Sequence, residues 1–275
     1  MLVTAVWGWT FVLVKDAVTQ YPTLPFLQLR FLLALVVMVL LVRRLPARRE
    51  LVIGSVVGAV VAGGYLTQTA GLTMTSPGNA GLITGLFVVF TPILNRLFGA
   101  PIRWWTWVAT VLSLAGLVLL TGGPSGMGLG ELLVLACAVL YALQIVLLGR
   151  WSPGMPAAPL AMVQMAACAL IFSAGGTWQL RLPSGAVWFA VVITGVFASA
   201  LGFYIQTWAQ GFISANRTAL IMATEPAWAL AAAVVLAGQR LGLVQAAGAA
   251  IVLAAIVGHE LASLKFEPHG QPSTT

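Results

Sequence analysis

The sequence predicts an all-α integral membrane protein with ten transmembrane helices, arranged as two inverted five-helix repeats. Composition gives the first indication: of 275 residues, 60% are hydrophobic and 7% are charged, whereas roughly a quarter of a soluble domain is charged. The second is the number of apolar stretches close to the ~20 residues that a helix needs to cross the hydrocarbon. The third is a similarity between the two halves of the chain.

Short breaks with turn-forming residues separate the expected helices, as at Ser76-Pro77-Gly78-Asn79 and Gly99-Ala100-Pro101. Short connections make consecutive helices antiparallel neighbours. No stretch alternates apolar and polar residues over about ten positions, which excludes a membrane β-barrel. The first span begins almost at Met1 without a basic segment, so no cleavable signal is expected. The expected spans are 2–20, 24–43, 51–73, 77–98, 103–121, 129–150, 157–178, 186–208, 215–236 and 242–262.

Basic residues predict the orientation, because cytoplasmic loops carry an excess of Lys and Arg. With the N-terminus inside, only Arg181 and Arg240 fall in outer loops. Both termini are therefore expected in the cytoplasm, with the chain in the inner or plasma membrane. The net charge of +7 then reflects topology, and no nucleic-acid partner is expected. The basic residues assigned to the inner side are Arg43, Arg44, Arg48, Arg49, Arg96, Arg103, Arg150, Arg217 and Lys265.

The internal similarity appears when the chain is shifted by 134 residues, and the shift drifts to 138 between the anchor points. Each half holds five spans, an odd number, so the second half lies upside down relative to the first. Inverted repeats of this kind recur in secondary transporters. The expected organisation is a first repeat at 1–122, a linker at 123–128, a second repeat at 129–262 and a cytoplasmic tail at 263–275. The matched positions are Trp7 with Tyr141, Pro25 with Pro159, Arg30 with Gln164, Pro92 with Pro226, and Gly64–Thr69 with Gly202–Thr207.

Three motifs resemble the EamA family of the drug/metabolite transporter superfamily: Trp7-Gly8-x-x-Phe11-x-x-x-Lys15, Leu29-Arg30-Phe31 and Glu225-Pro226. The resemblance covers nearly the whole chain in the family's order. One departure is Gln239, where the family often has Glu after a Gly. The resemblance implies ten helices, with spans 5 and 10 at the periphery, and the transport of small metabolites such as exported amino acids.

Glu225 is the main candidate for coupling or solute binding, because it falls near the centre of its span. An ionised carboxylate there costs about 2.5–3.5 kcal/mol on insertion scales. It is expected to bind protons or a solute amine. The alternative is a neutral carboxyl bonded to a neighbouring helix beside a proline kink. Pro226, and Pro92 at the matching position, are the expected kinks, since proline removes a backbone donor.

Two cations fall within the outer parts of spans 1 and 2. Lys15 is either a site residue or a side chain that reaches the outer interface. Arg30 lies deeper, and it is expected to pair with Asp16 or to bind a carboxylate. Gln164 replaces Arg30 in the second half, which makes the site electrically asymmetric.

Amides and aromatic residues complete the candidate set: Trp7, Gln68, Tyr204, Gln206 and Trp208. Polar and aromatic groups around one cavity suit an amphipathic solute. The alternative for the amides is hydrogen bonding between helices. Small residues four apart, such as Gly54 and Gly58 or Gly81 and Gly85, are expected to allow close helix packing.

The expected function is a secondary transporter that exports an amino acid or a related metabolite by alternating access. A multidrug or lipid-linked-sugar exporter of the same superfamily is the alternative, and a membrane-embedded enzyme is disfavoured. No Walker A pattern occurs, and the two histidines, His259 and His269, lie at or beyond the last span. No catalytic residue, metal or cofactor is expected. The expected partners are a small solute, the lipid bilayer and protons, for a monomer or homodimer.

Overall fold

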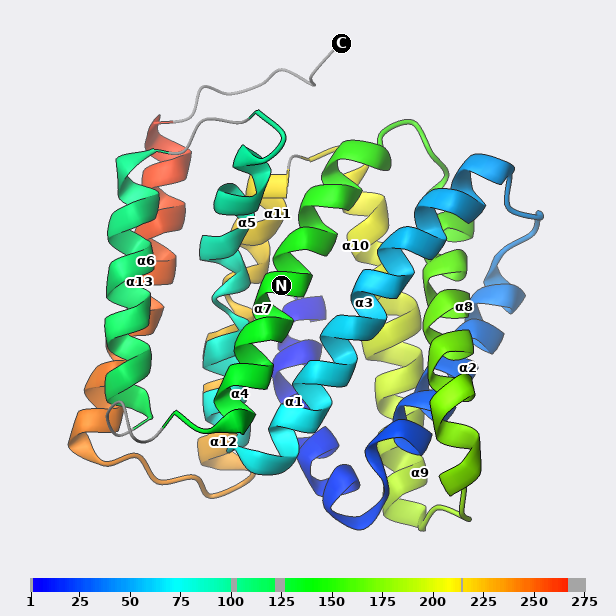
Figure 1. The fold of residues 1–275 in the computed structure, drawn as a ribbon, viewed down its shortest axis with the longest axis horizontal. Helices are drawn as coiled ribbons and strands as arrows, with labels where there is room; N and C mark the ends of the chain where they lie inside the picture. The colour runs from blue at the N-terminus through cyan, green and yellow to red at the C-terminus, as the bar shows by residue number, and fades with distance from the viewer. Residues whose placement is uncertain (1, 100–102, 122–126, 214, 267–275) are drawn as a thin grey trace.

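A computed structural model describes residues 2–99, 103–121, 127–213 and 215–266 of the chain. Over these ranges the chain forms helices joined by short segments, and it contains no strand. Most of the helices run side by side in one bundle (Figure 1). Residues 123–126 of the expected linker and 267–275 of the expected tail lie outside the described residues. Among the side chains left undescribed is that of Arg217, which the orientation argument used.

Helix bounds agree closely with the apolar stretches of the sequence. The first half contains α1 (Leu2–Gln20), α2 (Thr23–Leu41), α3 (Arg48–Met74), α4 (Pro77–Thr84), α5 (Phe87–Arg96) and α6 (Trp104–Leu120). The second half contains α7 (Leu129–Trp151), α8 (Ala157–Gly176), the 3₁₀ turn η2 (Thr177–Gln179), α9 (Gly185–Val192), the π-helical η3 (Ile193–Leu201), α10 (Gly202–Gln210), α11 (Ala215–Met222), α12 (Glu225–Val235) and α13 (Leu243–Phe266).

Seven helical segments in the described part of the chain are long and apolar enough to cross a membrane. The remaining expected spans correspond to shorter apolar helices, namely Trp104–Leu120, Glu225–Val235 and Leu243–His259. An all-helical membrane architecture is therefore supported, while the count of ten spans stays a prediction.

Three expected spans are not single α-helices, which corrects the sequence prediction. The stretch expected at 77–98 divides at Gly85 and Leu86 into α4 and α5, and the one expected at 215–236 divides at Ala223 and Thr224 into α11 and α12. Proline accounts for the second division: Pro226 stands in the first turn of α12, where its missing N–H costs no hydrogen bond. The stretch expected at 186–208 contains η3, and π-helical turns are frequent at functional sites.

The two divided spans cross each other through small residues. A Cβ atom added to Gly81 would lie 2.1 Å from the Cβ of Ala229, and one added to Gly85 would lie 2.1 Å from the Cγ of Pro226. Only glycine allows α4 and α12 to approach this closely. The packing role expected for Gly81 and Gly85 is confirmed.

The remaining helices pack in a pattern visible in Figure 1. α3 lies against α7 and α8, α2 lies against α8, and α1 lies against α12. α6 and α13 pack mainly on each other at one edge of the bundle, as the resemblance implied for spans 5 and 10. The other helices surround the centre of the bundle.

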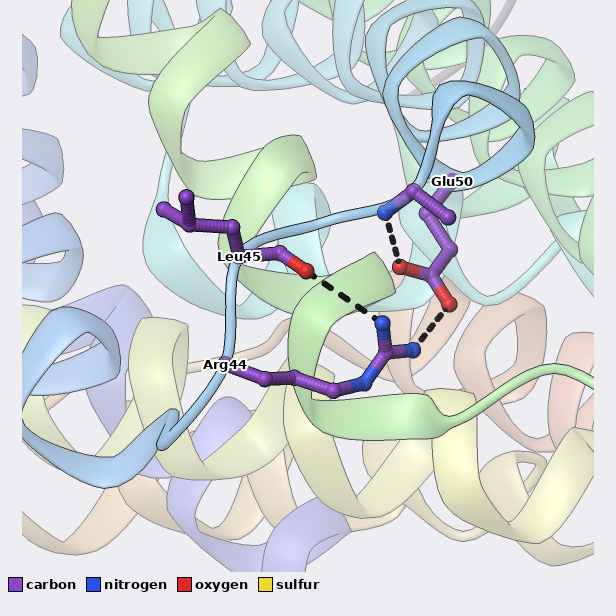
Figure 2. A network of polar contacts seen from close by, with 4 residues as sticks. Arg44, Leu45 and Glu50 are labelled. Atoms are coloured by element: carbon purple, nitrogen blue, oxygen red, sulfur yellow. Dashed lines mark hydrogen bonds and ion pairs between the residues drawn. The ribbon is translucent and has the colours of Figure 1, made fainter.

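The segment between α2 and α3 is held by a polar network shown in Figure 2. Glu50 accepts a hydrogen bond from the backbone N–H of Ala47 at 2.8 Å and forms an ion pair with Arg44. The Arg44 guanidinium also donates to the carbonyl of Leu45 at 3.2 Å. These contacts satisfy the first turn of α3 and fix the start of a helix whose middle reaches the site below.

Candidate functional site

A cavity that is partly open to solvent lies at the centre of the bundle. Its walls come from α1, α2, α3, α7, α10, α11 and α12. Because the lining helices come from both halves of the chain, the cavity lies where the halves meet.

One face of α1 forms a wall of the cavity. Trp7, Thr10, Phe11 and Val14 line it, and this spacing of three and four residues puts them on one side of a helix. The Trp7 indole N–H donates to the carbonyl of Ala198 in η3 at 2.7 Å. The indole is thereby fixed in the wall.

Arg30 of α2 contributes the cationic group. Its side chain is 2% exposed, and its guanidinium donates to the Ser199 hydroxyl at 2.8 Å and to the Tyr65 hydroxyl at 3.1 Å. The guanidinium carbon also lies 4.4 Å from the centre of the Tyr65 ring, in cation–π distance. Asp16 is exposed and does not pair with Arg30. Of the two roles expected for this arginine, the pairing with Asp16 is therefore wrong. No described carboxylate forms an ion pair with this arginine.

Glu225 stands at the first position of α12, where the divided span places it against α1. A Cβ added to Gly8 would lie 2.9 Å from the Glu225 carbonyl oxygen, so glycine allows this approach. The side chain is 5% exposed and lines the cavity. Among the described residues, its carboxyl group has neither a hydrogen-bond partner nor an ion-pair partner.

Gln68 and Gln206 also line the cavity. Gln68 donates to the Thr84 hydroxyl at 3.2 Å and accepts from the Tyr141 hydroxyl at 3.5 Å. Gln206 donates to other glutamine side chains. Both amides therefore make the interhelical bonds that the sequence offered as the alternative, and both also border the cavity.

Four other candidates lie away from the lining. The Lys15 amine donates to the carbonyls of Leu72, Thr73 and Thr75, at 2.8, 3.1 and 3.1 Å, and so satisfies the C-terminal end of α3. Gln164 is fully buried and donates to the Thr207 hydroxyl at 3.2 Å.

The two aromatic candidates on α10 face elsewhere too. Trp208 is 54% exposed and packs on the Phe212 ring, on the outside of the bundle. Tyr204 is half-buried and does not reach the lining. Of the two expected kinks, Pro226 begins α12, whereas Pro92 lies inside α5, beyond the break at Gly85 and Leu86.

The sequence-based candidates omit nine lining residues, and four of these, Tyr65, Tyr141, Gln144 and Phe203, lie on α3, α7 and α10. The internal repeat contained the signal. The shift of 138 that matches Gln68 with Gln206 also matches Tyr65 with Phe203, and the shift of 134 that matches Trp7 with Tyr141 places Gln144 opposite Thr10.

The chemistry of the cavity is that of recognition. It combines aromatic rings, neutral amides, a cation from Arg30 and a carboxyl group from Glu225. In the part of the chain that the structure describes, no group of three metal-ligating side chains occurs. Both cysteines, Cys137 and Cys168, are buried and unpaired.

Comparison with known proteins agrees with a transporter. An uncharacterized transporter of Archaeoglobus fulgidus is 28% identical over 260 residues, which cover 93% of this chain and 82% of the relative. The uncharacterized inner membrane transporter YedA of Escherichia coli K12 is 29% identical over 208 residues, or 71% of this chain and 68% of the relative. A protein of known crystal structure shares the fold with a TM-score of 0.70 at 22% identity, over 96% of each chain.

The sequence model of the EamA-like transporter family matches the chain twice, at residues 1–122 and 128–259. These two matches include every residue that lines the cavity. The chain therefore belongs to the EamA-like transporter family.

Proposed function

We propose that this chain is a secondary transporter that exports an amino acid or a closely related zwitterion across the inner or plasma membrane. One observation carries the proposal: Arg30 and Glu225 border the same cavity without pairing with each other. Charged groups are costly inside a membrane protein unless they are compensated. A solute with one carboxylate and one ammonium group would compensate both.

Each charged group of the cavity would bind one charged group of the solute. The Arg30 guanidinium uses the donors left over from Ser199 and Tyr65 to bind the solute carboxylate, a geometry that arginine favours. Glu225 binds the ammonium group. The rings of Trp7 and Phe203, whose centres lie 5.8 Å apart, supply an apolar wall for the rest of the solute.

The same carboxyl group is our candidate for proton coupling. A Glu225 side chain that exchanges solute ammonium for a proton would couple the two fluxes, because it cannot bind both at once. Its lack of a partner among the described residues supports this role, since a purely structural carboxyl would be expected to hold a hydrogen bond.

We propose alternating access between two inverted five-helix repeats, residues 1–122 and 129–262. The packing supports a twofold relation: α2 on α8 and α6 on α13 each join corresponding elements, and the contact of α4 with α12 is matched by that of α11 with α5. So does the lining, in which Trp7 and Tyr141, and Gln68 and Gln206, are matched pairs. In such repeats the two halves exchange conformations around a central site.

The proposed orientation, with both termini in the cytoplasm, has a direct test. Leu45 and Leu182 are 88% and 97% exposed, in the segments before α3 and before α9. An impermeant thiol reagent added to intact cells should label Leu182→Cys and spare Leu45→Cys. The native cysteines are buried and should add little background. The reverse labelling pattern would contradict the orientation.

The proposed solute class is tested by counterflow of radiolabelled amino acids in proteoliposomes. Arg30→Gln should lower counterflow roughly tenfold to hundredfold, the loss expected for one charged hydrogen bond. Arg48→Gln is the control, since it removes an exposed arginine at the start of α3. Transport of hydrophobic cations or lipid-linked sugars, with no counterflow of any zwitterion, would favour the alternative substrates and sink the proposal.

A further inference from the structure

A ladder of glutamine side chains forms part of the cavity wall. Gln144, Gln206 and Gln210 are 2%, 6% and 1% exposed. The amide nitrogen of Gln206 donates to the side-chain oxygens of Gln144 and Gln210, each at 3.1 Å. The amide nitrogen of Gln210 donates to the backbone carbonyl of Ile145 at 2.8 Å. Gln144 and Gln206 line the cavity, and Gln210 lies behind them.

One backbone atom sets the direction of the whole ladder. The Ile145 carbonyl can only accept, so Gln210 must turn its nitrogen toward that carbonyl and its oxygen toward Gln206. Gln206 must therefore present its nitrogen. The same nitrogen also donates to Gln144, which must accept this bond with its side-chain oxygen.

The contacts within the ladder provide no acceptor for the amide nitrogen of Gln144. It is buried, and it has no hydrogen-bond partner among the residues that the structure describes. Buried donors are nearly always paired in native proteins, so one that borders a cavity points to a partner in the cavity. The ladder keeps this nitrogen from turning back toward the protein, since any flip would set two donors against each other.

We propose that Gln144 determines which solute is carried, by donating this N–H to an uncharged oxygen on the solute's side chain. The solutes selected are amino acids with a hydroxyl or carboxamide side chain. A side-chain carboxylate would also accept the bond, but it would bring a second negative charge to a cavity lined by one cation. The inference rests on the proposed function, which assigns the two charged groups of the solute to Arg30 and Glu225.

Isosteric solutes give the test, in proteoliposome counterflow with the full chain. Threonine and valine differ by a hydroxyl against a methyl, and asparagine and leucine differ by a carboxamide against an isobutyl end. The wild type should prefer the polar member of each pair by about tenfold or more, as one lost hydrogen bond to a solute implies. Gln144→Leu should bring the ratio within each pair close to one.

Gln28→Leu is the matched control. Gln28 is also a buried glutamine, and its side-chain oxygen has no partner in the described part of the chain. Its amide nitrogen donates to the Thr177 hydroxyl at the contact of α2 with η2, away from the cavity. This variant should keep the wild-type ratio. Equal counterflow of the isosteres by the wild type, or a preference that survives in Gln144→Leu, would overturn the inference.

A second measurement needs no variant, in case Gln144→Leu fails to fold. Threonine should raise the melting temperature of the detergent-solubilised wild type more than valine does, and equal shifts would again overturn the inference. Counterflow distinguishes failure of this inference from failure of the proposed function. No counterflow of any zwitterion overturns the proposed function and this inference with it, whereas counterflow without a preference that depends on Gln144 overturns the inference alone.

Discussion

The divided span of the first half, α4 with α5, and that of the second half, α11 with α12, differ in the residue that stands before their matched prolines. Thr91 precedes Pro92 and is fully buried, with its hydroxyl donating to the Phe87 carbonyl at 2.7 Å. Glu225 precedes Pro226 and faces the cavity with no described partner. A threonine satisfied within its own helix is a structural residue. A carboxyl group without a partner is available to a ligand.

The difference extends to the breaks. In the first half the chain leaves the α-helix at Gly85 and Leu86, well before Pro92, so that proline lies inside α5. In the second half the break at Ala223 and Thr224 comes directly before Glu225. The position of the break relative to the proline therefore brings one side chain, and not its counterpart, to the cavity.

Removal of the Glu225 carboxyl group is expected to have the largest effect on transport. Glu225→Gln keeps the shape of the side chain but can neither pair with an ammonium group nor exchange a proton. We expect counterflow to fall roughly tenfold to hundredfold. We also expect its pH dependence between about pH 5 and pH 8 to disappear, as measured by initial rates in proteoliposomes.

The matched variant is Thr91→Val, at the counterpart position. It removes a hydroxyl that bonds only within its own helix, and transport should stay within about twofold of the wild type. Wild-type rates and an unchanged pH profile in Glu225→Gln would show that the two positions do not differ in function.

A smaller effect is expected at the crossing of the two spans. Gly81→Ala places a methyl group where Ala229 lies, which forces α4 away from α12. Overpacking of this kind costs about 1–3 kcal/mol, or roughly 2–10 °C in melting temperature for a chain of this size. The readout is thermal unfolding in detergent.

Gly185→Ala is its control, since no atom lies within 4 Å of a Cβ added there at the start of α9. It should leave the melting temperature unchanged or raise it slightly, as alanine favours a helix over glycine. Equal melting temperatures for the two variants would mean that the crossing is not tightly packed.

The sequence predicts the helices well and the site in part, for physical reasons. Hydrophobic length locates a membrane helix, and the stretch expected at 2–20 is α1. It does not tell which face points inward, because lipid and protein interior are both apolar. Gln206 and Trp208 are two positions apart and hence about 200° around the helix, so only one of the two could line the cavity.

Buried polar residues were the more informative signal. Arg30 and Glu225 were singled out because charge inside a span is costly, and both line the cavity. Lys15 met the same criterion but bonds the end of α3. Its partners are backbone carbonyls, which no pattern of residue types reveals.

The π-helical stretch η3 makes the site depend on chain length as well as on residue identity. A π turn accommodates an extra residue relative to an α turn. η3 directly precedes α10, so the side of α10 that carries Phe203 and Gln206 is set by how many residues η3 contains. Deleting one residue there would rotate α10 by about 100° and turn these side chains from the cavity. Insertions and deletions are therefore a route by which related chains could change solute without altering a binding residue.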